Sequence, residues 1–274
     1  MATPSQPSKA MIFYDIAMRH PCSPNPWKSR LALNFKNVAY STTLVPLPDI
    51  AQVRRDLGVD ACRKFADGSD FYTLPILIDP NTDAKIGDTF DIAEYLQTQY
   101  PDAGSGDLFP PQKLDYVFKL ENPLFVPLSE SKAGEHDEYS QFNMYVDAAF
   151  TTHVGLLAYY IPFDGPSEEP SKAEFIRRAG VKSWADFEIK GEMREKMLES
   201  LRLMMGDLGK LFLRDPSGPF LLGEQASYAD LIVGGWLRMM SATLPKHEWE
   251  EARSWHGGVF GRLHDGLEKY AEVK

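Results

Sequence analysis

A cysteine and a serine stand side by side near the start of the chain, in the stretch His20-Pro21-Cys22-Ser23. The stretch separates an apolar β-type run from a helical pattern that has a proline in its first turn, where proline is tolerated. A thiol or hydroxyl at this place faces unpaired backbone N–H groups and the positive end of a helix dipole. That setting favours an anion and lowers the pKa of a thiol. A serine before a helix is also a common cap, so this feature alone leaves the capping interpretation open.

A second feature is the proline in Thr73-Leu74-Pro75-Ile76, which enters an apolar strand. Proline is unfavourable inside a sheet, so the pattern indicates a sheet edge or a cis turn. A cis bond would turn the backbone of Leu74 outward, and its N–H and C=O would be free to pair with an extended peptide. The alternative is an ordinary proline at the start of a strand.

A third feature is Asp88-Thr89, which follows Gly87 at the start of an amphipathic helical pattern. A carboxylate and a hydroxyl at a helix start can hold the ammonium and the carboxylate of an amino acid. Plain N-capping explains the same residues. Farther along, Ser227 and Asp230 form a capping-box pattern before an apolar helix, and we expect a structural role for them.

The elements that must position these residues differ between the two halves of the chain. The first half alternates strands with helices, in the order βαβ, a gap, then ββα, which predicts a small α/β domain over residues 10–101. A Gly-, Ser- and Pro-rich linker follows, and an all-helical domain is expected over residues 112–274. Strands are predicted over 10–16, 40–45, 74–78 and 85–87, helices over 27–37, 89–99, 142–160, 188–214 and 227–243, and an excursion between helices over 161–187.

Composition narrows the possible functions. The chain has 274 residues and a net charge of −10, so it lacks the clustered positive charge that nucleic acids and anionic membranes attract. Its two cysteines, Cys22 and Cys62, cannot build a disulfide framework or a zinc quartet, and we expect no metal. The Ser- and Pro-rich residues 1–10 predict a loose tail rather than a secretory signal. A cytoplasmic protein that binds neither nucleic acid nor membrane is the expectation.

The order of the four features resembles that of the cytosolic glutathione transferases. In that family a thioredoxin-like domain (βαβ-α-ββα) precedes an all-helical domain, an active-site serine, cysteine or tyrosine lies near the end of the first strand, and a cis-proline begins the third. The resemblance therefore implies an α/β plus all-α fold, glutathione as co-substrate and a homodimer. The matching positions are Ser23, Leu74-Pro75, Asp88-Thr89 and Ser227 to Asp230.

Within the family, the stretch from Ser23 to Asn34 resembles the fungal etherase-related Fua class, which is similar to bacterial lignin β-etherases. This resemblance implies a serine-type site, with Ser23 rather than Cys22 in the catalytic position, because Trp27-Lys28-Ser29-Arg30 aligns on the first helix. It also implies aromatic ligands from plants or wood, or xenobiotics to be detoxified. The residues expected to bind glutathione are Asn25, Leu74, Pro75, Asp88 and Thr89.

The second substrate should lie beside the sulfur, against the helical domain. Tyr145, Phe150 and His153 are candidates for its wall, although aromatic residues at helical spacing are more often core. Two functions stay open at this point. One is an enzyme that conjugates, cleaves aryl ethers or reduces peroxides, and the other is a ligandin that holds aromatic compounds with little turnover.

Overall fold

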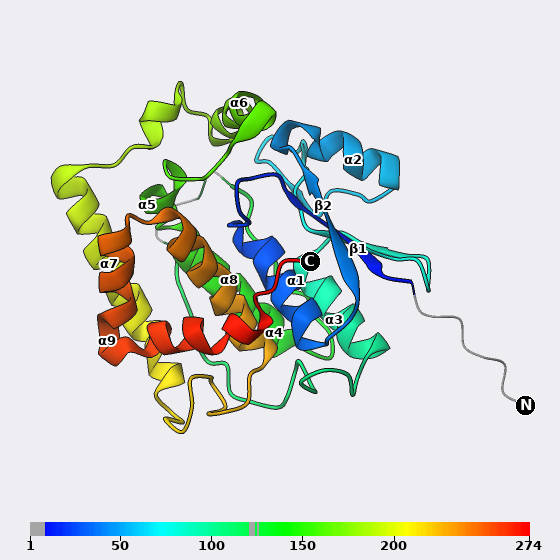
Figure 1. Cartoon of the computed structure of the whole chain (residues 1–274). Coiled ribbons are helices and arrows are strands. Elements are labelled where there is room, and N and C mark those ends of the chain that lie inside the picture. The colour runs from blue at the N-terminus through cyan, green and yellow to red at the C-terminus, as the bar shows by residue number, and fades with distance from the viewer. Residues whose placement is uncertain (1–8, 121–123, 125) are drawn as a thin grey trace, which may run out of the picture.

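The computed structural model describes residues 9–120, 124 and 126–274, so the tail expected over residues 1–10 lies almost wholly outside the described part. A four-stranded mixed sheet forms one side of the molecule, and helices form the other (Figure 1). β1 runs parallel to β2 with Met11 opposite Tyr40, and β5 is antiparallel to both β1 and β6. The strands, in the order β2-β1-β5-β6 across the sheet, are Tyr40–Val45, Met11–Ile16, Ile76–Asp79 and Ala84–Ile86.

Three helices belong to the sheet domain: α1 (Pro24–Phe35), α2 (Ile50–Leu57) and α3 (Thr89–Gln99). α1 is buried along almost its whole length because it packs against α3 and also against α8 of the other half. The predicted thioredoxin-like arrangement, βαβ-α-ββα, is therefore confirmed. A short hairpin that the sequence analysis did not predict, β3 (Arg63–Lys64) and β4 (Asp70–Phe71), lies between α2 and β5.

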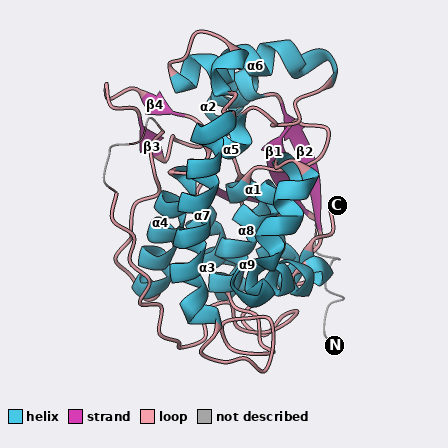
Figure 2. Ribbon diagram, turned by 90° about the vertical axis from the view of Figure 1, so that its left-hand side faces the viewer, coloured by secondary structure: helices cyan, strands magenta, loops and turns pink. Residues whose placement is uncertain are grey.

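The second half is all-helical in its described residues, as predicted (Figure 2). The helix expected over 142–160 is broken near Thr152. Several backbone N–H groups there donate to the carbonyl three residues earlier in place of the carbonyl four residues earlier that an α-helix uses. The expected excursion over 161–187 contains a full helix, α6, and a further helix that was not predicted, α9, follows α8. The α-helices are α4 (Asp137–Thr151), α5 (Gly155–Ala158), α6 (Glu168–Ala179), α7 (Gly191–Phe212), α8 (Tyr228–Thr243) and α9 (Lys246–Gly266), and short 3₁₀ helices cover Leu47–Asp49, Gly165–Ser167, Trp184–Phe187 and Glu268–Tyr270.

α9 is kinked where His256, Gly257 and Gly258 all adopt positive φ angles, of 52°, 72° and 74°. Such angles are favourable for glycine and interrupt a right-handed helix. Because glycine is unfavourable inside a helix, the two adjacent glycines made this segment look non-helical in the sequence. The kink lies beside α7, where the His256 ring is 2.7 Å from the Arg202 carbonyl oxygen.

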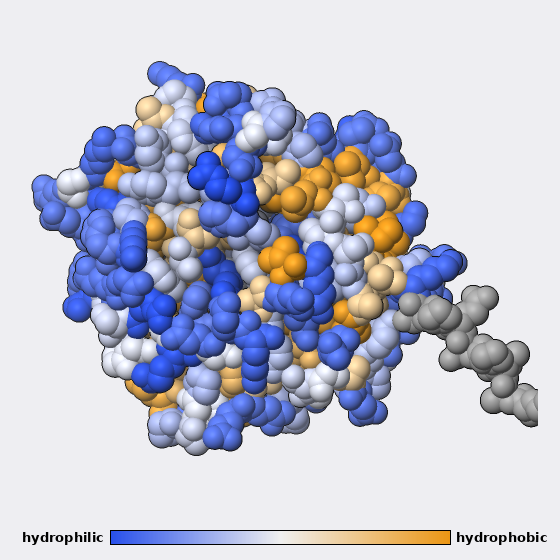
Figure 3. Space-filling view, in the orientation of Figure 1, coloured by the Kyte–Doolittle hydropathy of each residue, from blue (hydrophilic) through white to orange (hydrophobic). Residues whose placement is uncertain are grey.

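The C-terminal residues tie the two halves together. The side-chain amide of Asn34 in α1 donates to the carbonyls of Tyr270 and Glu272, and Thr42 N in β2 donates to the Lys274 carbonyl at 2.9 Å. The face shown in Figure 3 is largely hydrophilic, with its apolar side chains gathered mainly near the sheet. No helix among the described residues is long and apolar enough to cross a membrane.

Candidate functional site

Ser23 precedes α1 as its N-cap. Its backbone is extended (φ −63°, ψ 131°), and its carbonyl accepts the first helical hydrogen bond from Trp27 N at 3.1 Å. Within the described part of the chain, its hydroxyl makes no capping bond, so the capping interpretation does not account for this side chain. Pro24 and Pro26 have no N–H, so Asn25 supplies the one N–H donor among the first three residues of the helix. The hydroxyl of Ser23 and the N–H of Asn25 are thus the donors that α1 offers at its start.

Cys22 lies next to Ser23 and is a buried member of the hydrophobic core, although it also belongs to the lining of the cavity described below. It is 1% exposed, and its Sγ lies 3.1 Å from the sulfur of Met18. Burial, together with the negative charge of Asp15, raises the pKa of the Cys22 thiol. A thiolate is therefore unfavourable at this position, even though the residue stands before a helix.

The peptide bond between Leu74 and Pro75 is cis, as one of the sequence interpretations predicted. The fully buried side chain of Arg54 holds this segment against the turn before α3. Its guanidinium donates to the carbonyls of Thr73 at 2.6 Å and Gly87 at 3.2 Å. A Cβ on Gly87 would lie only 2.1 Å from this guanidinium, so glycine is required for the close approach. Arg54 thereby fixes two loops whose residues were predicted to act together.

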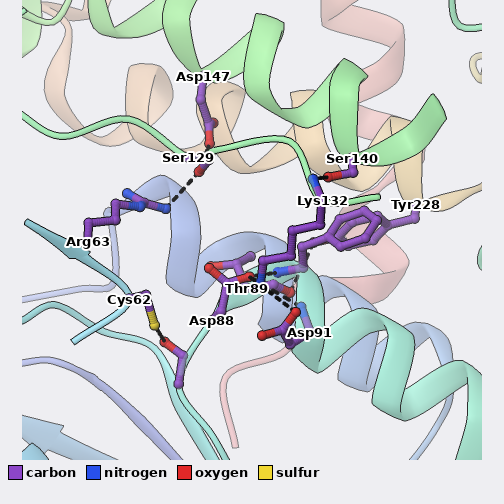
Figure 4. A network of polar contacts seen from close by, with 12 residues as sticks. Cys62, Arg63, Asp88, Thr89, Asp91, Ser129, Lys132, Ser140, Asp147 and Tyr228 are labelled. Atoms are coloured by element: carbon purple, nitrogen blue, oxygen red, sulfur yellow. Dashed lines mark hydrogen bonds and ion pairs between the residues drawn. The ribbon is translucent and has the colours of Figure 1, made fainter. Parts of the chain in front are cut away.

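Asp88 caps α3, as the capping interpretation predicted. Its carboxylate accepts from Phe90 N at 2.9 Å and Asp91 N at 3.3 Å, and it also lies 3.2 Å from the ammonium of Lys132 (Figure 4). Burial opposes ionisation, but the positive charges of Lys132 and Arg63, together with the hydrogen bonds from Lys132 and from Asp91 N, keep the pKa of Asp88 below its usual value. The buried Thr89 beside it receives a hydrogen bond at its carbonyl from the hydroxyl of Tyr228.

A cavity of about 210 Å³ lies between the two halves of the molecule, and Ser23 and Asn25 form part of its wall. The hairpin contributes Arg63 and Phe71, and most of the remaining lining is apolar. α6 covers the cavity: its Arg178 donates to the Tyr72 carbonyl at 3.0 Å and so joins the helical half to the sheet domain. The helical half contributes Val154, Ile161, Phe163, Phe175, Trp236 and Met239.

The cavity wall is built from other aromatic residues than those the sequence analysis selected. Phe150 is buried behind the wall and stacks on Trp236, with the ring centroids 5.3 Å apart. His153 is also buried, 2.8 Å from the Ala149 carbonyl and 3.0 Å from Ser200 Oγ, and burial lowers its pKa. Tyr145 lines a neighbouring hollow. Among the described residues, the structure therefore does not bring Tyr145, Phe150 and His153 to the cavity that contains Ser23.

A chain of polar contacts that the sequence analysis missed crosses the wall of this cavity. It runs from Lys28 in α1 through Asp147 in α4 to Ser129 and Arg63. Lys28 and Asp147 are charged residues on the inner faces of their helices, which is the only signal that the sequence carried.

Comparison with known proteins identifies the family. The glutathione S-transferase N-terminal domain is matched over residues 22–99 and the C-terminal domain of the same family over residues 143–270. Together the two matches span most of the chain. The chain belongs to the glutathione S-transferase family, and this agrees with the observed fold.

Several of the similar proteins come from fungi. A glutathione S-transferase of Ceriporiopsis subvermispora, solved in complex with glutathione, is 28% identical, with 97% of this chain and 99% of that chain covered and a TM-score of 0.76. Glutathione transferase GSTFuA2 of Phanerochaete chrysosporium is 26% identical, with 97% and 100% covered and the same TM-score. The glutathione S-transferase-like protein ustS of Aspergillus flavus is 26% identical, with 92% of this chain and 87% of that protein covered. The protein is a glutathione transferase similar to these fungal proteins.

Proposed function

We propose that this transferase activates glutathione with the hydroxyl of Ser23, which donates a hydrogen bond to the sulfur and stabilises the thiolate. The observation that carries the proposal is the position of this hydroxyl. It makes no capping bond at the start of α1 in the described structure, and Ser23 is one of the residues that line a largely apolar cavity between the two halves. The neighbouring thiol of Cys22 is buried and has a raised pKa, which argues against a cysteine-based mechanism.

The required stabilisation is modest. A free thiol has a pKa of about 8.5, and lowering it by about two units corresponds to roughly 2.7 kcal/mol. One hydrogen bond to a charged group contributes about 1.5–3 kcal/mol, and the helix start adds a smaller amount. Because Pro24 and Pro26 remove two backbone donors, the Ser23 hydroxyl and the Asn25 N–H must supply most of the stabilisation of the thiolate. Ser23 acts here as a donor and forms no covalent bond.

The rest of glutathione would extend along the loops that Arg54 joins. The backbone of Leu74, before Pro75, would pair with the peptide part. Asp88 would accept from the γ-glutamyl ammonium and Thr89 would donate to its carboxylate. Lys132 now lies against Asp88, so binding in this way requires the two cations to share or exchange that carboxylate.

The second ligand would be an aromatic compound in the apolar cavity. Apolar and aromatic walls with a few polar groups are typical of such sites. The reaction would be conjugation, cleavage of an aryl ether or reduction of a peroxide. The same lining also favours a second candidate, a ligandin that holds aromatic molecules with glutathione and turns over little. Turnover of chlorodinitrobenzene, an aryl ether and an organic hydroperoxide, measured beside displacement of a bound fluorescent dye, separates the two.

The central test compares Ser23→Ala with Cys22→Ala. We expect Ser23→Ala to lose most turnover and to raise the thiol pKa of bound glutathione, measured by thiolate absorbance, while glutathione still binds. Cys22→Ala should leave both measurements close to the wild type. Loss of activity in the cysteine variant alone would overturn the proposal and favour a mixed-disulfide mechanism.

A homodimer and a cytoplasmic location complete the proposal and rest on the family resemblance. Sedimentation of the purified protein at micromolar concentration tests the first, and imaging of a tagged chain tests the second. A monomer in sedimentation would remove the dimer from the proposal.

A further inference from the structure

Asp147 is the centre of a buried polar network. It lies in α4, is 3% exposed, and accepts hydrogen bonds from three separate segments of the chain. The ammonium of Lys28 in α1 contacts its Oδ1, and Trp236 Nε1 in α8 donates to the same oxygen at 2.7 Å. Ser129 Oγ donates to Oδ2 at 2.8 Å. One carboxylate therefore joins α1, α4, α8 and the segment that precedes α4.

The network ends at the rim of the cavity. Ser129 Oγ, besides donating to Asp147, accepts a hydrogen bond from Arg63 Nη2 at 2.7 Å (Figure 4). Arg63 comes from the β3–β4 hairpin of the sheet domain, so this contact crosses between the two halves. Asp147, Ser129, Arg63 and Trp236 all line the cavity that Ser23 lines.

Charge explains why the network is held together. Lys28 is completely buried, and an unpaired ammonium there would be very unfavourable. Burial lowers the pKa of Lys28, while the negative charge of Asp147 opposes that change. A second acceptor, Asn143 Oδ1, lies 2.8 Å from the same ammonium. Removing the charge of Asp147 would therefore leave the buried ammonium of Lys28 without the one carboxylate that contacts it in the described structure.

Three donors already occupy the carboxylate of Asp147. It is thus poorly suited to accept a proton or a hydrogen bond from a ligand. Its partners, in contrast, are placed so that they determine how the start of α1 lies relative to the opposite wall of the cavity. Lys28 lies roughly one and a half helical turns after Ser23, and Trp236 forms part of the opposite wall. A carboxylate that bonds to both fixes the distance between them.

We propose that Asp147 is a positioning residue for the transferase reaction: it fixes the start of α1, with Ser23, against the Trp236 wall and holds Arg63 at the cavity rim through Ser129. This inference rests on the proposed role of Ser23. The groups proposed to bind glutathione at Leu74 and Asp88 are held separately, by Arg54 and by the cap of α3. Loosening the network should therefore impair the alignment of the two substrates and leave glutathione affinity unchanged.

The test measures kcat for chlorodinitrobenzene conjugation and, by calorimetry, the Kd for glutathione, in Asp147→Asn and in a matched control. The control is Glu248→Gln, which breaks a similarly buried ion pair, between Arg194 and Glu248, with side chains 11% and 8% exposed. Neither residue lines the described cavity. We expect Asp147→Asn to lower kcat roughly ten- to a hundredfold with glutathione Kd within about twofold of the wild type. Glu248→Gln should lose stability and keep its kcat.

A second variant, Ser129→Ala, keeps the pair of Lys28 and Asp147 and removes only the link to Arg63. It should fold, lower kcat by roughly three- to tenfold and leave glutathione Kd unchanged. It decides the question by itself if Asp147→Asn does not fold. Wild-type kcat in a folded Asp147→Asn, wild-type kcat in Ser129→Ala, or an equal loss of kcat in Glu248→Gln would each overturn the inference.

The same assay distinguishes the two proposals. An inactive Ser23→Ala together with a fully active Asp147→Asn overturns the positioning role alone. Full activity in Ser23→Ala overturns the proposed function and, with it, the positioning role that rests on it.

Discussion

Cys22 and Ser23 are adjacent in the chain and both belong to the cavity lining, but the Cys22 thiol is buried 3.1 Å from the sulfur of Met18, whereas Ser23 is half-buried at the start of α1. Burial and the negative charge of Asp15 raise the pKa of the Cys22 thiol. A helix start can therefore lie next to a cysteine without activating it.

This relationship predicts how the two cysteines react. Cys62 is exposed, although its Sγ donates to the Gly87 carbonyl at 3.0 Å, and burial of part of the side chain raises its pKa. A thiol reagent should modify Cys62 slowly in the native protein, and Cys62→Ser should abolish that reaction. Cys22 should react at least roughly a thousandfold more slowly than Cys62, because a reagent reaches the buried thiol only when the protein unfolds. Mass spectrometry after timed labelling measures both, and rapid labelling of Cys22 would contradict the buried position.

A second prediction separates the two roles of Asp88. Asp88→Asn keeps an oxygen that can accept from Phe90 N, and asparagine is as good an N-cap as aspartate. The variant should therefore melt close to the wild type. It loses the negative charge proposed to hold the γ-glutamyl ammonium, so glutathione affinity should fall by about 1.5–3 kcal/mol. Differential scanning calorimetry and titration calorimetry measure the two effects.

Asp88→Ala serves as the comparison, because it removes the cap as well and should cost about 1 kcal/mol of stability. An aromatic dye that binds in the cavity should be held nearly as well by both variants. If Asp88→Asn binds glutathione like the wild type and only Asp88→Ala is impaired, Asp88 acts solely as a helix cap.

The local features of the site could be predicted from the sequence because neighbouring residues determine them. The cis bond before Pro75, the cap at Asp88 and the capping box of Ser227 and Asp230 all depend on contacts within a few residues. Both hydrogen bonds of the capping box are present. The predicted strands of the sheet domain were also found, since their apolar patterns are short and bounded by turn residues.

Long-range contacts could not be predicted in this way. Lys28 and Asp147 are 119 residues apart, and no periodicity indicates that two charged residues will meet inside the protein. The aromatic residues of α4 show a different limit, because Phe150 was expected at the cavity wall and lies behind it. Phe150 has the spacing of an inner helical face, but α8 covers that face, so Trp236 reaches the cavity in its place. Helical spacing identifies which face is buried and leaves open what covers it.

The last prediction concerns the pH dependence of stability and uses the buried carboxylate of Asp230. It accepts from Leu221 N at 2.8 Å and Ser227 N at 2.7 Å, yet burial raises its pKa to about 6. An unfolded aspartate has a pKa of about 3.9, so the folded state binds this proton more tightly. The tighter binding of this proton stabilises the folded state by roughly 3 kcal/mol. This stabilisation is fully present below about pH 4 and is lost as the pH rises through about 6.

Asp230→Asn removes this titration and keeps a polar side chain of the same size. Asparagine offers one acceptor oxygen where aspartate offers two, so the variant should be less stable than the wild type at every pH. The difference should nevertheless be larger at pH 4.5 than at pH 7, by about 2 kcal/mol, because the wild type alone loses the protonated form. Urea unfolding of both proteins at the two pH values measures the difference. A gap that stays constant between pH 4.5 and pH 7 would show that Asp230 remains ionised throughout, and its buried hydrogen bonds would then outweigh the cost of burying its charge.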